Sequence, residues 1–284
     1  MNILYSGDAR ISDGVLISIL SLLKHVRQPL HIYLLTAAMT ANGQHYAPVK
    51  DTTAAFLNRL VSQRNPQSTV KKIDITALFT ANPPLVNMAT RFTPGCMLRL
   101  YSDQVPELPD RLLYLDADVV CRQDPTDFYA QDLGQAEFVG VLDHYGKWFF
   151  HHGLRPFDYI NSGVLLLNMP QIRKTGLFAK TRERCRTRKM FMPDQSALNK
   201  LAVHKRLAPA KYNEQHDMKP DTVFQHFTTR LFFFPYFHTQ TVKPWQPQAM
   251  HQVLHVHAYD DILKEYTALA PALKGSYSHD KNYL

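Results

Sequence analysis

Short apolar runs alternate with segments of helical periodicity in the first part of the chain, and this alternation predicts the fold. Residues 2–6, 30–35 and 71–75 are apolar enough to form short buried strands. Between them, residues 12–24 and 53–61 carry apolar side chains at helical spacing. Strand–helix–strand alternation is typical of a mainly parallel sheet covered by helices, so we expect an α/β fold.

The later part of the chain continues this pattern and then changes in composition. Further strands are expected at residues 111–115, 137–142 and 161–168, and further helices at residues 171–188, 194–202 and 251–269. An aromatic run at residues 231–237 precedes Lys243-Pro244-Trp245. We therefore divide the chain into a main domain, residues 1–225, and a C-terminal segment, residues 226–284, that completes the site. A segment of about 60 residues supports only a marginal core of its own.

Composition and charge narrow the class of protein. A formal charge of +8 favours anionic partners such as nucleotide phosphates, acidic glycans or an anionic lipid surface. No basic repeat or aromatic RNA-binding signature accompanies it, so we expect no nucleic-acid partner. Three widely spaced cysteines favour a reducing compartment. Without a signal-peptide pattern or a membrane-spanning run, the chain is expected to be cytoplasmic, with peripheral association with the inner face of the membrane left open.

The strongest chemical signal is a pair of carboxylates where the strand at residues 111–115 ends. Asp116, Ala117 and Asp118 follow this strand directly. Ligands of open parallel sheets bind beyond the carboxyl ends of the strands, and carboxylates separated by one residue can project to the same side. Paired anionic oxygens suit Mn²⁺ or Mg²⁺, which commonly complete their shell with substrate phosphate oxygens. A solvated acidic turn is the alternative interpretation.

The same residues also fit a second enzyme class. Residues 116–120 resemble the nucleophile loop of haloacid-dehalogenase-type phosphatases, in which the first Asp attacks phosphate and the second acts as acid–base. That loop normally lies near the start of a chain, whereas about 115 residues precede it here. This position makes the phosphatase the weaker hypothesis.

An ordered series of motifs resembles glycosyltransferase family 8, the retaining nucleotide-sugar transferases that include bacterial lipopolysaccharide galactosyl- and glucosyltransferases. The motifs are ILYSGD at the start, MLRLY at 97–101, LLYLDADVV at 112–120, VLDHY at 141–145, YINSGVLLLNM at 159–169, PDQSALN at 193–199, KYN at 211–213 and HTQTVKPW at 238–245. The series covers nearly the whole chain. The resemblance implies a GT-A fold, in which a Rossmann-like nucleotide half joins an acceptor half.

The resemblance also implies a metal and a nucleotide-sugar donor. Asp116 and Asp118 would bind the ion, usually Mn²⁺ with Mg²⁺ as the alternative, and His238 would be the third protein ligand. Lys243 matches the family lysine that contacts the diphosphate of the UDP-sugar, where a fixed cation stabilises charge on the leaving nucleotide. His226, 17 residues before Lys243, competes with His238, which lies five residues before it.

Other positions match the family's donor contacts. They are Ser6 and Asp8 for the uracil and ribose, Ala117 between the carboxylates, Arg99 for the donor sugar or phosphate, and Asp143 and Asn161 for the sugar. Ala9-Arg10 departs from the family's commoner polar pair at the base contacts. Asp194 and Gln195 match the pair beneath the anomeric carbon and are the candidate catalytic residues. Because an amide is a poor nucleophile, a front-face mechanism is favoured over a covalent intermediate.

These residues predict transfer of glucose or galactose from a UDP-sugar to a glycan, glycolipid or glycoprotein acceptor. A sugar-nucleotide-binding protein without turnover is the alternative from another class, since a decayed transferase keeps its fold. The aromatic run at residues 232–237 either packs the C-terminal segment or touches a membrane. Trp148 is expected in a loop over the site. His251, His255 and His257 are interpreted as exposed, because we expect no cysteine or carboxylate to complete a zinc site with them.

Overall fold

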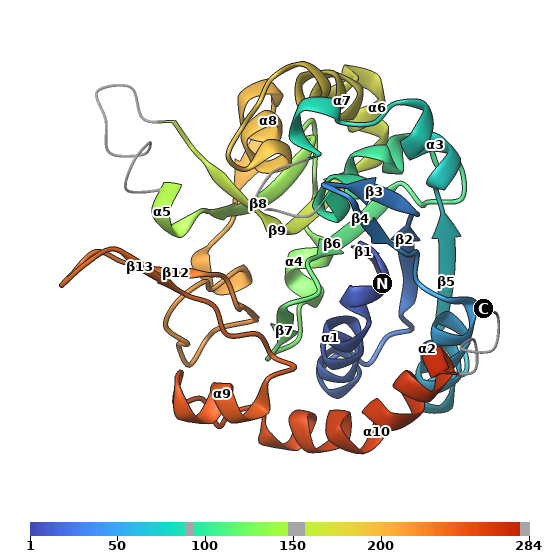
Figure 1. The fold of residues 1–284 in the computed structure, drawn as a ribbon, viewed down its shortest axis with the longest axis vertical. Helices are drawn as coiled ribbons and strands as arrows, with labels where there is room; N and C mark the ends of the chain where they lie inside the picture. The colour runs from blue at the N-terminus through green and yellow to red at the C-terminus, as the bar shows by residue number, and fades with distance from the viewer. Residues whose placement is uncertain (89–93, 147–156, 279–284) are drawn as a thin grey trace.

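A seven-stranded sheet forms the centre of the molecule, with helices on both sides (Figure 1). The computed structural model describes residues 1–88, 94–146 and 157–278. The strand order is β10-β8-β9-β6-β1-β2-β5. Its strands are β1 (Asn2–Ser6), β2 (His31–Thr36), β5 (Thr69–Asp74), β6 (Arg111–Leu115), β8 (Phe138–Leu142), β9 (Ile160–Asn168) and β10 (Lys205–Leu207). Strand β9 is antiparallel to β6 and β8, and the other pairs are parallel. The predicted mainly parallel α/β sheet is therefore confirmed.

The two faces of the sheet bury different helices, because side chains alternate along each strand. Ile3 and Tyr5 belong to one apolar cluster, and Leu4 between them belongs to the other. The first cluster packs under α1 (Ser12–His25), α2 (Asp51–Arg64) and α10 (Asp260–Ser278), and the second under η3 (Pro94–Gln104), α6 (Met169–Thr175), α7 (Leu177–Thr187) and α8 (Pro193–Leu201). Helix α10 contacts both α1 and α2, so the C-terminal segment closes the first layer (Figure 1).

Two of the predicted helices are interrupted in the structure. The helix expected at residues 171–188 breaks at Gly176, which adopts a left-handed conformation with φ 67° and separates α6 from α7. The helix expected at residues 251–269 is two helices, α9 (Pro247–Gln252) and α10. His255 lies between them with φ 53°, a conformation that a helix cannot contain. Trp148 lies outside the described residues.

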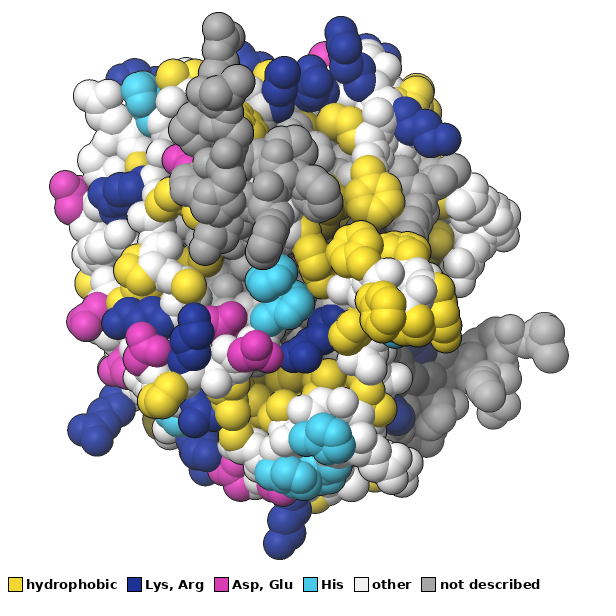
Figure 2. All heavy atoms as spheres, turned by 90° about the vertical axis from the view of Figure 1, so that its left-hand side faces the viewer, with side chains coloured by type: hydrophobic (Ala, Val, Ile, Leu, Met, Phe, Trp, Pro, Cys, Tyr) yellow, Lys and Arg dark blue, Asp and Glu magenta, His cyan; other side chains and the backbone are white. Residues whose placement is uncertain are grey.

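Shorter elements decorate the central sheet. The small strands are β3 (Met39–Ala41), β4 (Gln44–Tyr46), β7 (Val119–Cys121), β11 (Phe224–His226), β12 (Arg230–Phe232) and β13 (His238–Gln240). The short helices are η1 (Ala9–Ile11), α3 (Thr76–Ala81), η2 (Leu85–Asn87), α4 (Thr126–Ala130), α5 (His144–Gly146) and η5 (Ala210–Tyr212). Across the described ranges, every helix is too short or too polar to span a bilayer. The β12–β13 hairpin projects from the body (Figure 1), and hydrophobic side chains gather on the face toward which it points (Figure 2).

Candidate metal centre

Two aspartates and a histidine converge at the carboxyl end of β6. Asp116 and Asp118 follow this strand, and the Asp116 amide donates to the carbonyl of Gly163 on β9 at 2.8 Å. Strand β7, which continues from the pair, is antiparallel to β11, with Val119 opposite His226. This register places His226 Nε2 at 3.2 Å from Asp118 Oδ1 and 3.8 Å from Asp116 Oδ2. One ligand atom from each of the three residues lies within 4.8 Å of the others.

The second nitrogen of His226 fixes the direction in which the ring points. His226 Nδ1 lies 3.2 Å from Asn213 Oδ1, while the Asn213 amide nitrogen donates to Asn161 Oδ1 at 2.9 Å. Because the amide oxygen is the end that faces the ring, Nδ1 carries the proton and donates, which leaves the Nε2 lone pair facing the two carboxylates. Histidine ligands in metal sites are commonly oriented by such a bond to the other ring nitrogen.

The space for the imidazole exists because residue 163 is a glycine. A Cβ added to Gly163 would lie 2.1 Å from His226 Cε1 and 2.9 Å from Asp116 Oδ2. Any side chain at this position would therefore displace the histidine or the carboxylate. The three-residue donor set, two hard oxygens and one imidazole, fits a divalent cation such as Mn²⁺.

The structure does not bring His238 into this group. Its ring stacks on Phe232 at 4.9 Å between centroids, and Nδ1 lies 3.1 Å from the Tyr236 carbonyl oxygen. Among the described residues, the histidine that joins the two aspartates is His226. The reason is the β12–β13 hairpin, whose base is closed by the Thr229 and Thr241 hydroxyls at 2.8 Å. The hairpin carries His238 away from the carboxylates. It leaves His226 beside them, although His226 lies further from Lys243 in sequence.

Two cationic side chains, the half-buried Lys243 and the buried Arg99, neutralise the carboxylates in this structure. The Lys243 ammonium contacts Asp118 Oδ2 and donates to the Phe227 carbonyl at 2.8 Å. Arg99 Nη2 lies 2.9 Å from Asp116 Oδ1. Burial raises the pKa of Asp118, but the Lys243 ammonium and then His226 outweigh it and hold that pKa below its usual range. The Asp118 carboxylate is thus ionised, as a ligand of a cation must be.

A row of buried polar side chains extends from this pair toward β8 and α8. Asp143 Oδ2 accepts from Asn161 Nδ2 at 2.9 Å and from Gln195 Nε2 at 3.2 Å. Gln195 Oε1 accepts from the Ser162 amide at 2.9 Å, and Arg99 Nε lies 3.4 Å from Asp194 Oδ2. Burial raises the pKa of Asp194, and Arg99 opposes that shift. The structure therefore brings together Arg99, Asp116, Asp118, Asp143, Asn161, Asp194 and Gln195, which come from five separate motifs.

The predicted nucleoside residues lie at the end of β1. Ser6 Oγ is 3.2 Å from the Tyr114 hydroxyl, which in turn donates to Asp116 at 2.6 Å. Asp8 is buried and accepts from the backbone and guanidinium nitrogens of Arg10. The departure from the family at Arg10 thus has a structural consequence, because the Arg10 guanidinium is hydrogen-bonded to both oxygens of the Asp8 carboxylate.

Ala117 lies where helix α1 approaches the acidic pair. A Cβ added to Gly14 on α1 would meet the Ala117 carbonyl oxygen at 2.4 Å and the Trp245 ring at 2.7 Å. The close fit needs glycine in the helix, and it packs Trp245 of the Lys-Pro-Trp motif against the same point. Neither Gly14 nor Gly163 was singled out from the sequence, although Gly163 lies inside a motif that carried the resemblance.

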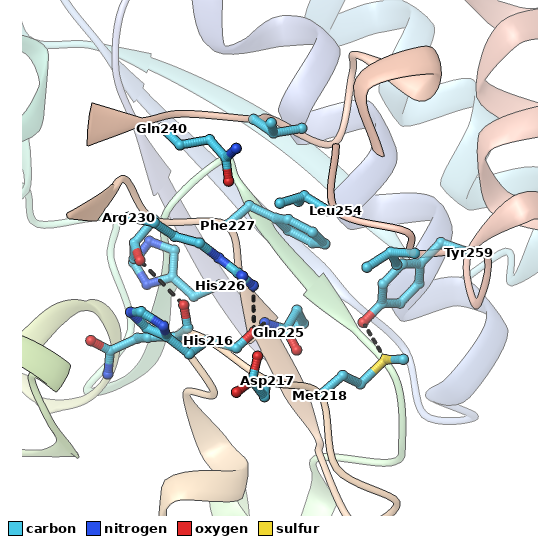
Figure 3. Close-up of a pocket in the computed structure, with 14 residues that line it drawn as sticks. His216, Asp217, Met218, Gln225, His226, Phe227, Arg230, Gln240, Leu254 and Tyr259 are labelled. Atoms are coloured by element: carbon cyan, nitrogen blue, oxygen red, sulfur yellow. Dashed lines mark hydrogen bonds between the residues drawn. The ribbon is translucent and has the colours of Figure 1, made fainter. Parts of the chain in front are cut away.

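A cavity of about 250 Å³ lies beside the centre, at the base of the hairpin (Figure 3). His226 forms part of its wall, so the cavity adjoins the three ligand-type residues. Its polar lining includes His216, Asp217, Arg230 and Gln240, and its apolar lining includes Phe227, Leu254 and Tyr259. The lining is more polar than apolar, which suits a ligand that carries hydrogen-bonding groups.

A second group of ligand-type side chains lies at the surface between α9 and α10. His251 Nε2 is 2.7 Å from Asp260 Oδ1, and His257 Nδ1 is 3.4 Å from Asp260 Oδ2. The expectation that no carboxylate accompanies these histidines is therefore wrong. The break between the two helices folds the first residue of α10 back onto α9, which a continuous helix would not do.

Comparisons with known proteins relate this chain to glycosyl transferases. The family model described as glycosyl transferase family 8 matches residues 2–249. The probable glycosyl transferase Gly of Streptococcus gordonii is 33% identical over 116 residues, which are 40% of this chain and 16% of that protein. The chain thus matches about a sixth of that relative's length.

Solved structures with the same fold have low sequence identity to this chain. The galactosyltransferase LgtC, in complex with donor and acceptor sugar analogs, is 17% identical with a TM-score of 0.62, and the match covers 96% of each chain. The bifunctional glycosyltransferase WbbM is 16% identical with a TM-score of 0.68, over 97% of this chain and 51% of that chain. These likenesses confirm the predicted GT-A fold.

Proposed function

We propose, from the premise that this chain belongs to glycosyl transferase family 8, that it is a retaining glycosyltransferase. It transfers a hexose, glucose or galactose, from a UDP-sugar to a glycan, glycolipid or glycoprotein acceptor. The observation that carries the proposal is the convergence of Asp116, Asp118 and His226 beside Lys243. The donor set suits a divalent ion, and the lysine supplies a further positive charge where a diphosphate would lie.

Asp116, Asp118 and His226 are the residues that would hold the ion. Imidazole makes Mn²⁺ the better fit, with Mg²⁺ as the alternative. When bound, the ion neutralises charge on the diphosphate leaving group. Lys243 lies on Asp118 in this structure, so donor binding requires its ammonium to turn from the carboxylate to a phosphate oxygen. Its charge then stabilises the leaving nucleotide rather than the aspartate.

The polar row orients the transferred sugar. Both oxygens of Asp143 already accept hydrogen bonds, Oδ1 from the backbone amides of Tyr145 and Gly146 and Oδ2 from side-chain amides. A carboxylate engaged on both oxygens is a weak nucleophile. Asp194, which is buried and next to Arg99, is placed to orient sugar hydroxyls and to stabilise positive charge at the anomeric carbon.

The amide of Gln195 is bonded at both ends and is a poor nucleophile, which favours a front-face substitution. The bond from the anomeric carbon to the diphosphate breaks, and its electron pair leaves on the phosphate oxygen. The acceptor hydroxyl forms the new bond on the same face and gives its proton to that phosphate oxygen. Retention of configuration follows from attack on the face that the leaving group vacates.

The nucleoside and the acceptor take the two flanks of the centre. Ser6 and the Asp8–Arg10 pair at the end of β1 form the nucleoside side, next to the Ala117 backbone. The cavity beside His226, whose lining includes Arg230 and Asp217, would take the acceptor. A binding protein without turnover would use the same cation to hold the diphosphate, so turnover is the measurement that separates it from an enzyme. Family membership disfavours the phosphatase alternative.

Hydrolysis of a UDP-sugar in the absence of acceptor tests the proposal. Wild-type protein with Mn²⁺ is expected to release UDP from UDP-glucose or UDP-galactose, and Asp118→Asn is expected to lose this activity while keeping its unfolding transition. Asp127→Asn, an exposed carboxylate on α4, is the matched control and should behave as wild type. Absence of turnover with specific UDP binding would leave the binding protein as the function. Phosphate release from simple monoesters without any effect of UDP on the melting temperature would indicate the phosphatase.

A further inference from the structure

The tip of the β12–β13 hairpin exposes a group of aromatic side chains, which we call the aromatic tip. The exposed fractions are 65% for Phe233, 88% for Phe234, 69% for Tyr236 and 59% for Phe237. Burial in the core is the default role of phenylalanine, and several largely exposed rings in one place are unusual for a soluble surface. Packing within the folded chain therefore does not explain why these side chains are apolar.

The base of the hairpin is fixed to the body, in contrast to its tip. The Leu231 amide donates to the Tyr145 hydroxyl at 2.5 Å, and Arg230 Nη2 donates to the His216 carbonyl at 3.0 Å. The Thr229 and Thr241 hydroxyls close the ladder at 2.8 Å. The tip is thus presented at a defined place and direction, as Figure 1 shows for the projecting strands.

We propose that the aromatic tip is a docking surface for an anionic lipid bilayer. A projecting finger offers convex apolar surface, whereas a protein partner would need a matching concave pocket. A bilayer accepts such a finger without shape complementarity, and aromatic side chains are favoured at the membrane–water interface. The tip therefore enters the headgroup region and leaves the body outside.

The distribution of charge selects an anionic membrane. Between Arg230 and Lys243, the sequence LFFFPYFHTQTV has no Asp, Glu, Lys or Arg, so insertion of the tip buries no formal charge. The two residues that flank it are cationic, and the whole chain carries a formal charge of +8. Lys and Arg side chains lie along the upper edge of the face that carries the hydrophobic cluster (Figure 2). An uncharged aromatic tip beside basic surface complements anionic headgroups.

The position of the hairpin in the chain ties the membrane to the metal centre. The hairpin leaves the body four residues after His226 and returns three residues before Lys243. Docking through the tip would hold the adjoining cavity close to the headgroups. A glycan carried by a lipid is the acceptor class that this position favours, and this consequence, unlike docking itself, rests on the proposed function.

Vesicle co-sedimentation of the full chain, without nucleotide or metal, tests the proposal. Vesicles of phosphatidylcholine alone are compared with mixtures containing phosphatidylglycerol. Wild type is expected to bind the anionic vesicles, and more weakly at high salt. The double variant Phe233→Ser/Phe234→Ser should bind them at least about tenfold more weakly than wild type. The matched control is Leu85→Ser/Val203→Ser, which removes apolar side chains that are 60% and 66% exposed elsewhere and should bind as wild type.

Three outcomes would overturn the proposal. They are wild-type protein that does not bind anionic vesicles, a tip variant that binds as tightly as wild type, and a control variant that loses binding equally. Self-association of wild type that the tip variant abolishes, without vesicle binding, would make the tip an interface between copies of this chain. Hydrolysis of a UDP-sugar in solution, measured on the same preparations, reports separately on the proposed function, because none of these substitutions touches the metal centre.

Discussion

His226 and Lys243 are held by polar partners in the candidate metal centre, whereas Phe233 and Phe234, which lie between them in sequence, face solvent. Both regions belong to one stretch of about twenty residues. In the centre, the side chains of Asp116, Asp118 and His226 each have a polar partner, so their geometry is fixed before any ligand arrives. At the tip, apolar surface is left for something outside the chain. The comparison shows that a short segment can supply a rigid site at its ends and an interaction surface in its middle.

The first test of this comparison replaces, one at a time, His226 in the centre and His238 on the hairpin. His226→Ala should lower Mn²⁺-dependent UDP-sugar hydrolysis by more than the roughly 10- to 100-fold that loss of a ligand's hydrogen-bond partner typically costs. His238→Ala should stay close to wild type, because its ring contacts Phe232 and Tyr236 rather than the carboxylates. Metal titration by calorimetry gives the affinities. The opposite ranking would make His238 the ligand and would require the hairpin to fold back over the centre.

The second test uses the glycine that makes room for His226. In Gly163→Ala, the new methyl would lie 2.1 Å from His226 Cε1, so we expect metal affinity to fall about tenfold or more and unfolding free energy to fall by about 1–3 kcal/mol. Gly275→Ala on α10 is the matched control, since a Cβ there meets nothing within 4 Å and should be neutral or stabilising by up to about 1 kcal/mol. Unchanged metal affinity in Gly163→Ala would show that His226 is not held at the ligand position.

These tests concern the point at which sequence reasoning was least reliable. The acidic pair could be predicted because a strand that ends in Asp116-Ala117-Asp118 needs only local pattern and the rule for ligand sites in parallel sheets. The histidine that joins the acidic pair could not be predicted, because the choice between His226 and His238 depends on where a hairpin turns back. The sequence of residues 231–237 fits a buried strand and an exposed hairpin tip equally well. Only the structure of the rest of the domain distinguishes the two. Spacing along the chain measures distance in space only where the intervening residues follow a straight path.

The same limit explains the helix errors. The helical spacing of apolar residues in 171–188 continues through Gly176. A single left-handed residue redirects the chain but leaves the hydrophobic pattern almost unchanged. At the C-terminus, the pattern predicted one helix where the structure has α9 and α10. The contact of His251 with Asp260 was therefore not expected. Side chains that meet across such breaks belong to different elements, and no periodicity within one element predicts their contact.

The smallest expected effect concerns stability at the tip. Phe234→Ser should change the free energy of unfolding by no more than about 0.5 kcal/mol, because the side chain is already in water in the folded protein. Phe224→Ala, a fully buried ring on the strand that carries His226, should cost about 3–5 kcal/mol. Urea unfolding followed by circular dichroism gives both values. A loss of several kcal/mol in Phe234→Ser would mean that the ring packs on the body in solution, and the tip would then have no apolar surface left to offer a bilayer.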